Sequence, residues 1–163
     1  MGRLMNLYIR RMVDYLAKEG DRIAHKAMAS KEALDRSNNM NDAYGYIVFY
    51  DGRMQKKGYA LPTNMASGIH KGWDKAGVKD GTGREWLDDF MDTWRPESKG
   101  FVLIVVNAAF YAGILEQGRQ TNVGANPHYG KQYQIISQIT TDMKDLQGKF
   151  KGSTLSGKNI YIK

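Results

Sequence analysis

The side chains most able to do chemistry in this sequence are four carboxylates that share one face of a predicted helix. The helix spans residues 85–94, and its acidic face comprises Glu85, Asp88, Asp89 and Asp92. Carboxylate oxygens are the ligands that a hard cation prefers. The other face carries Trp86 and Phe90, and an amphipathic helix turns its charged face to water without any ligand. We therefore interpret the acidic face as a solvated surface able to meet a basic partner, and we predict no metal.

The remaining titratable groups form no catalytic set. The three histidines are scattered and show neither an HxxxH nor an HExxH spacing, so zinc is not expected. Glu116 is the best single candidate for a catalytic acid, but it has no acid–base partner nearby in sequence, and Arg119 is a simpler ion-pair partner. The absence of cysteine excludes disulfides and thiolate chemistry. We predict that the protein is not an enzyme and needs no cofactor.

The segment that precedes Glu116 predicts a buried strand. Residues 101–106 are six consecutive apolar residues rich in β-branched side chains, which is typical of a strand buried on both faces. The strand is expected to break at Asn107. A connector then leads through Tyr111 to Glu116 and Gly118.

Hydrophobic periodicity predicts a long helix at the start of the chain, over residues 3–36. Its apolar stripe comprises Met5, Tyr8, Ile9, Met12, Tyr15, Leu16, Ile23, Ala27 and Leu34. Glu19 interrupts the stripe and Gly20 follows it, so a kink or a break into two helices is expected there.

A β-hairpin follows the first helix. The first strand, residues 44–50, leads into Asp51-Gly52, which favours a two-residue type I′ turn because both positions need positive φ. The second strand carries Lys56 and Lys57, as expected of an edge strand protected against pairing with other chains.

The glycine-rich residues 61–83 are predicted to be a long loop, with Trp73 as a large apolar side chain inside it. Thr82 and Glu85 have the spacing of a capping box at the start of the next helix, and Pro96 limits that helix.

A final helix is predicted over residues 131–147. The order helix, hairpin, helix, strand, helix predicts an α+β fold, in which helices pack on one face of an antiparallel sheet that contains the hairpin. We expect a single domain over residues 1–150, followed by a basic tail over residues 151–163.

Positive charge gathers at the two ends of this 163-residue chain, whose net charge is +7. Residues 1–36 hold eight basic and five acidic residues, and residues 144–163 hold five and one. Such ends can bind nucleic acid or an acidic protein surface. No run approaches the roughly 18 apolar residues of a membrane span, and residues 1–16 carry charges where a signal peptide is apolar. We expect a soluble protein with no membrane partner.

The order of these motifs resembles the tail-completion or neck proteins of long-tailed bacteriophages. The resemblance rests on the long first helix, the polar turn and strand over residues 41–48, and the strand that feeds Tyr111, Ala112, Glu116 and Gly118. It also includes a loop with Asn126, Pro127, His128 and Tyr129 before the last helix. The chain departs from the family pattern after the acid, where it has Gln117, Gly118 and Arg119.

The resemblance implies a structural virion protein that forms a ring in the neck and joins head to tail around the DNA channel. It implies six-fold or twelve-fold self-assembly, a portal, adaptor or head-closure protein on one side, and a tail terminator or tail tube on the other. DNA would pass through without specific recognition, and assembly would take place in the host bacterial cytoplasm. Expected contact residues are Trp73, Tyr111, Glu116, Gly118, Arg119, Pro127 and Tyr129, together with the acidic helix face.

The alternative is a small basic nucleic-acid-binding protein. Its ten tyrosines could stack on bases, although strand propensity and the helical stripe also explain several of them. Binding that weakens steeply with salt would distinguish this class from an assembly protein.

Overall fold

The computed structural model describes residues 2–30, 37–72, 79–97, 99–112 and 136–150. The helices and strands follow in the order α1 (Arg3–Ser30), α2 (Asn39–Asp42), β1 (Tyr44–Tyr50), β2 (Arg53–Tyr59), α3 (Gly83–Thr93), β3 (Phe101–Asn107) and α5 (Ser137–Gln147). The predicted α+β class, long amino-terminal helix and antiparallel sheet are confirmed. The expected tail over residues 151–163 lies outside the described residues.

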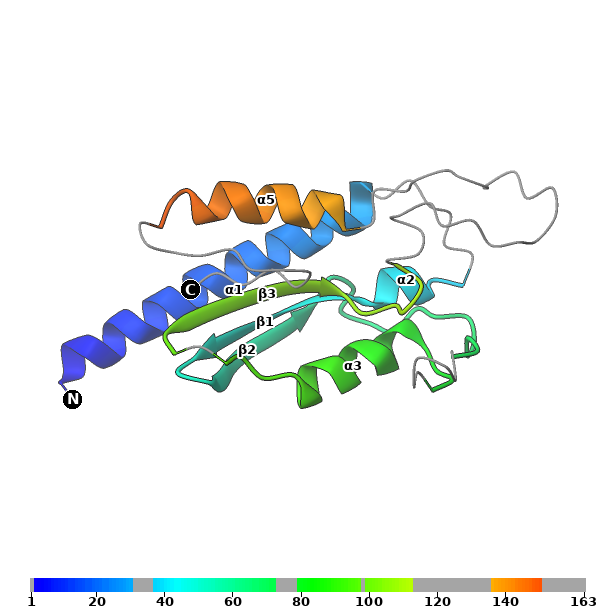
Figure 1. Ribbon diagram of the computed structural model, residues 1–163, viewed down its shortest axis with the longest axis horizontal. Helices are drawn as coiled ribbons and strands as arrows, with labels where there is room; N and C mark the ends of the chain where they lie inside the picture. Colours follow the sequence, from blue (N-terminus) through cyan, green and yellow to red (C-terminus); the bar gives the residue numbers. More distant parts are fainter. Residues whose placement is uncertain (1, 31–36, 73–78, 98, 113–135, 151–163) are drawn as a thin grey trace.

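The three strands form an antiparallel sheet in the order β2-β1-β3, with helices above and below it (Figure 1). The side chains of β1 and β3 alternate between the two faces of the sheet. Val48 and Leu103 pack with α1 and α5, whereas Ile47 and Ile104 pack with α3. The prediction of helices on one face therefore holds for α1 and α5. It was wrong for α3, which covers the other face, because β1 and β3 are apolar on both sides.

The hairpin prediction is confirmed in its turn and in its edge strand. Asp51 and Gly52 have φ values of 47° and 76°, as a type I′ turn requires. Strand β2 lies at the edge of the sheet and is mostly exposed. Its Lys56 pairs with Asp14 on α1, so one edge-strand lysine also holds the sheet to the first helix.

The break expected at Gly20 does not occur, since α1 runs without interruption from Arg3 to Ser30. Gly20 is buried, and a Cβ there would lie 2.9 Å from atoms of Leu103 and Tyr46. The glycine thus lets the helix backbone approach the sheet closely, and the close packing offsets its low helix propensity. The predicted continuation over residues 31–36 lies outside the described residues.

A buried polar junction ties α2 to α3. The Asn39 side chain accepts a 2.7 Å hydrogen bond from the Gly83 amide and donates to the Gly68 carbonyl. Asp42, which is fully buried, accepts from the Met65 amide through both carboxylate oxygens. These bonds satisfy the buried side chains of Asn39 and Asp42 and the buried amide of Gly83. They hold the described part of the 61–72 loop against the start of α3.

The start of α3 confirms the predicted capping box. The Thr82 hydroxyl accepts from the Glu85 amide, and the Glu85 carboxylate accepts from the Thr82 amide. This reciprocal pair satisfies two of the free amides at the first turn. The helix ends at Thr93, before Pro96, as expected.

Helix α5 packs on α1 through Ile139, Met143 and Leu146, all nearly inaccessible. The first residues of the predicted helix, 131–135, lie outside the described residues. An ion pair joins the two helices where Lys26 donates to Asp142 at 2.7 Å. None of the described helices is long and apolar enough to span a membrane.

We expect Gly83→Ala to destabilise the protein by about 3 kcal/mol, at the upper end of the usual cost of overpacking. A Cβ at this position would lie 1.6 Å from the Asn39 carbonyl oxygen, so backbone would have to move. Gly68→Ala is the matched control, because nothing lies within 4 Å of its added Cβ. Urea unfolding measures both, and equal midpoints for the two variants would contradict this account of the junction.

Asp142 is expected to make stability depend on pH in the acid range. Burial alone would raise the pKa of this carboxyl, but hydrogen bonds from Lys26 and Gln138 and the charges of Lys26 and Arg22 outweigh it and lower the pKa. The folded pKa therefore lies below the unfolded value of about 3.9. The stabilisation is complete above the unfolded pKa and is lost as pH falls through the folded pKa.

Asp142→Asn should flatten the acid limb of a plot of melting temperature against pH and cost about 1–3 kcal/mol at neutral pH. The control is Asp145→Asn, an exposed carboxylate on the same helix, which should leave the limb as in the wild type. An unchanged acid limb in Asp142→Asn would show that this ion pair does not set the acid sensitivity.

Candidate functional site

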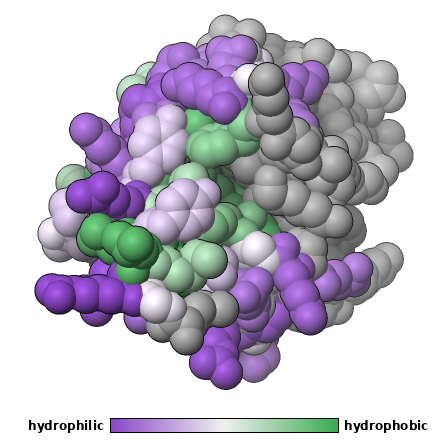
Figure 2. Space-filling model, turned by 90° about the vertical axis from the view of Figure 1, so that its left-hand side faces the viewer, coloured by the Kyte–Doolittle hydropathy of each residue, from purple (hydrophilic) through white to green (hydrophobic). Residues whose placement is uncertain are grey.

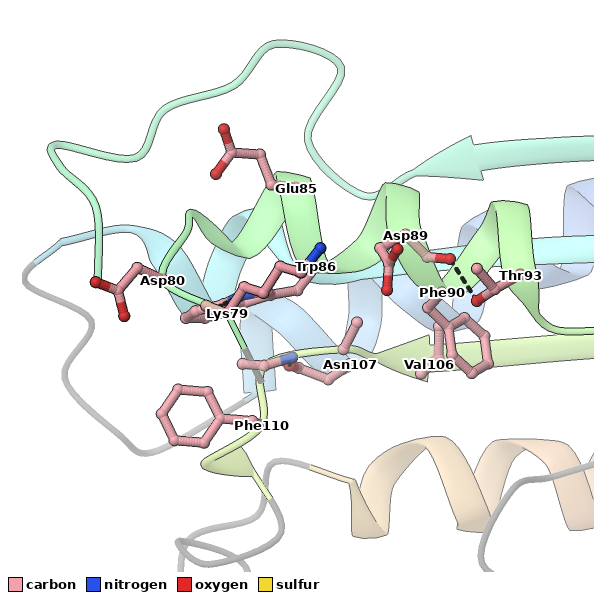
Figure 3. A pocket seen from close by; sticks show the side chains of 12 residues that line it. Lys79, Asp80, Glu85, Trp86, Asp89, Phe90, Thr93, Val106, Asn107 and Phe110 are labelled. Atoms are coloured by element: carbon pink, nitrogen blue, oxygen red, sulfur yellow. Dashed lines mark hydrogen bonds between the residues drawn. The ribbon is translucent and has the colours of Figure 1, made fainter. Parts of the chain in front are cut away.

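A pocket of about 680 Å³ lies between α3 and the far end of β3 (Figure 3). Helix α3 contributes aromatic and acidic side chains from one side, and the end of β3 contributes the other wall. The lining residues are Lys79, Asp80, Glu85, Trp86, Asp89, Phe90, Thr93, Val106, Asn107, Ala108, Ala109 and Phe110. Its volume falls within the range of pockets that bind ligands or side chains of a partner.

Asn107 shapes the β3 wall of the pocket by ending the strand, as the sequence predicts. The side-chain nitrogen of Asn107 donates to the Met40 carbonyl at 3.2 Å, and its side-chain oxygen accepts from the Ala109 backbone amide at 3.0 Å. The second bond turns the chain out of the sheet and brings Phe110 to the pocket.

Four aromatic rings cluster at this end of the molecule. His70 lies 5.1 Å from Tyr111 between ring centroids, and Trp86 lies 5.2 Å from Phe110 with the rings at 84°. His70 also contacts both Trp86 and Phe110 edge-on. Edge-to-face and tilted pairs at these distances are favourable. The cluster brings three segments together, namely the 61–72 loop, α3 and the residues after β3.

The rim of the pocket is acidic. Three carboxylates and one lysine line it, which is a net charge of −2. Glu85 is held by the capping box, and Asp80 accepts a 2.7 Å bond from the Gly72 amide. Asp89 is exposed, and its carboxylate pairs with no group in the described part of the chain.

The predicted acidic face of α3 is divided between two environments. Asp88 accepts from the Tyr59 hydroxyl, and Asp92 pairs with Lys57 at 3.2 Å, so both tie the helix to β2. Burial, followed by the hydrogen bond to Asp88, raises the pKa of Tyr59. Arg84 also lies 3.9 Å above the Tyr59 ring. Glu85 and Asp89 instead face the pocket, so only this half of the acidic face belongs to the candidate site.

A second surface lies at the opposite end of the molecule, where α1 begins (Figure 1). We call residues 3–11 the amino-terminal arm. All of them are exposed except the half-buried Ile9. Leu4 and Leu7 are 83% and 44% exposed, and their spacing of three residues places them next to each other on the helix surface. Figure 2 views this end and shows apolar surface set among strongly hydrophilic side chains.

The structure describes the positions of only some of the contact residues that the sequence suggested. Tyr111 lies in the aromatic cluster, and Glu85 and Asp89 line the pocket beside it. The other suggested positions lie outside the described residues; they are Trp73, Glu116, Gly118, Arg119, Pro127 and Tyr129.

The sequence did not indicate the partners of Tyr111 in this cluster. Trp86 and Phe90 were assigned to the core face of the helix, and they are half-buried in the pocket wall. His70 lies within the predicted loop over residues 61–83, and no motif in the sequence includes Phe110. A usable signal was the gathering of large aromatic residues immediately after the strand, at 110 and 111.

Within the described ranges, no group of three or more histidine, cysteine or acidic side chains could hold a metal ion. No protein-family model, curated protein or solved structure matches the chain. The aromatic faces and carboxylates that line the pocket can both attract a cationic side chain.

The division of the acidic face predicts unequal effects of two aspartate substitutions on the same helix. Asp88→Ala removes the acceptor of the Tyr59 hydroxyl and should cost about 1 kcal/mol. Asp89→Ala should change the free energy of unfolding by no more than about 0.5 kcal/mol, as expected of an exposed side chain that pairs with none of the described residues. Urea denaturation compares the two, and an equal loss would contradict the assignment.

Proposed function

We propose that this protein is a structural subunit of the neck of a tailed bacteriophage, forming a ring that joins head to tail around the DNA channel. The observation that supports the proposal is that the molecule has two surfaces of different chemistry at opposite ends, the acidic, aromatic pocket and the exposed amino-terminal arm. A ring needs such an arrangement, because each copy contacts its two neighbours through different faces.

The motif order supports the same function. The long first helix, the polar turn and strand over residues 41–48, and the strand that feeds Tyr111 and Ala112 occur in the order that resembles the tail-completion and neck proteins. In this role the protein acts by assembly and has no catalytic activity. Its neighbours are further copies of itself, a portal, adaptor or head-closure protein, and a tail terminator or tail tube. It works in the virion after assembly in the bacterial cytoplasm.

Nucleic-acid binding is the second candidate, favoured by the exposed arginines of the amino-terminal arm. Arg3, Arg10 and Arg11 are all exposed, and residues 2–13 contain no acid. Arginines can contact phosphates without reading sequence. Retention of the isolated protein on DNA that falls steeply with salt, together with normal virions when the gene is deleted, would favour this candidate.

Genetic complementation tests the neck function. Deleting the gene from the phage should yield filled heads and separate tails by electron microscopy, and a plasmid copy should restore joined particles. Leu4→Asp combined with Leu7→Asp should fail to restore them, whereas the surface control Arg53→Glu on the hairpin should restore them. Normal virions without the protein would refute the proposal.

A further inference from the structure

We propose that the amino-terminal arm of one copy binds in the aromatic, acidic pocket of the next copy. The inference rests on the proposed ring assembly and assigns its subunit contact to named residues. The arm and the pocket then form the contact between neighbouring copies, and the other faces of each copy remain for the head and tail partners.

The arm has an outward face that packs against no other element among the described residues. At about 100° per residue, Arg3, Leu4, Leu7 and Arg11 fall within about 100° of arc. That arc points away from the stripe through which α1 buries Leu16, Gly20 and Ile23. Tyr8 and Ile9 turn toward the protein, where Tyr8 contacts Phe101 edge-on. A helix that exposes leucines and arginines together on its outer face matches the way amphipathic helices dock into apolar grooves.

The charges of the two surfaces are complementary. The arm carries three arginines, Arg3, Arg10 and Arg11, and no acid. The pocket carries three carboxylates and one lysine. Asp89 has no partner in the described part of the chain, so an incoming arginine would not have to displace one. Complementary charge of this kind favours the correct register between copies and faster association.

The apolar parts are complementary as well. Trp86, Phe90 and Phe110 present partly exposed aromatic surface inside the pocket. Leucine side chains can cover that surface, and arginine can stack on the faces of aromatic rings. Burying Leu4 and Leu7 would remove apolar area from water on both copies.

The positions of the two surfaces fit a head-to-tail contact. Figure 1 places the start of α1 at one end of the molecule and α2, which lies against the first turn of α3, at the other end. A contact between opposite ends of identical chains is heterologous, and it closes into a ring when the rotation between copies allows. An arm-to-arm contact would instead be isologous and would stop at a dimer.

The test uses the full-length chain and native mass measurement. The arm variant is Leu4→Asp with Leu7→Asp, and the pocket variant is Asp89→Arg. Arg53→Glu and Asp145→Arg are controls of matched charge change at exposed sites away from both surfaces. Circular dichroism and thermal unfolding confirm that each variant is folded, as expected because every substituted side chain is exposed.

We expect the wild type and both controls to form a closed oligomer, and each contact variant to assemble at least about tenfold more weakly. An equal mixture of the arm and pocket variants should form heterodimers, because the intact arm of one variant meets the intact pocket of the other. It should form nothing larger, since the two remaining ends are both defective.

Three outcomes would overturn the contact. A pocket variant that assembles like the wild type would show that the arm does not bind in the pocket. If the wild type also sediments with anionic vesicles, the arm would be assigned to lipid instead. A mixture that stays monomeric would show that the two surfaces do not bind each other. A wild type that remains monomeric would also reject the contact, while head-to-tail joining would still be decided separately by complementation.

Discussion

The arrangement of this molecule depends on the buried junction between α2 and the first turn of α3. Asn39 binds the Gly83 amide and the Gly68 carbonyl with one side chain, and no residue larger than glycine fits at position 83. The junction sets where α3 begins and therefore which of its side chains face the sheet, the hairpin and the pocket. Because unpaired amides are costly inside a protein, the junction tolerates little displacement.

Helix α1 combines two roles along one continuous element. From Val13 onward it buries an apolar stripe against the sheet and α5, and Gly20 lets the helix backbone approach the sheet closely. Before Val13 the same helix extends past most of the protein and exposes leucine and arginine to water. The well-packed body can hold the arm in a helical form that an isolated peptide of this length would not maintain. A preorganised arm loses less conformational entropy on binding.

Where a structural signal lies within a few neighbouring residues, the structure agrees with the prediction from the sequence. Asp51-Gly52 forms a turn because the two residues tolerate positive φ, and Thr82 with Glu85 forms a capping box because the spacing alone brings the groups together. Gly20 is different, since its propensity favours a break while its neighbours in the sheet favour close packing. The close packing outweighs the low helix propensity. This outcome can be understood only once Tyr46 and Leu103 are known to lie opposite Gly20.

The sequence by itself therefore determined the α+β class, the hairpin, the capped helix and the buried strand, because periodicity and turn chemistry act over a few neighbouring residues. Only the tertiary structure decided that α3 covers the second face of the sheet and that its carboxylates divide between β2 and a pocket. It also decided that His70, Trp86 and Tyr111 form one aromatic cluster. These outcomes depend on contacts between residues far apart in the chain, and no local pattern encodes which distant side chains will meet.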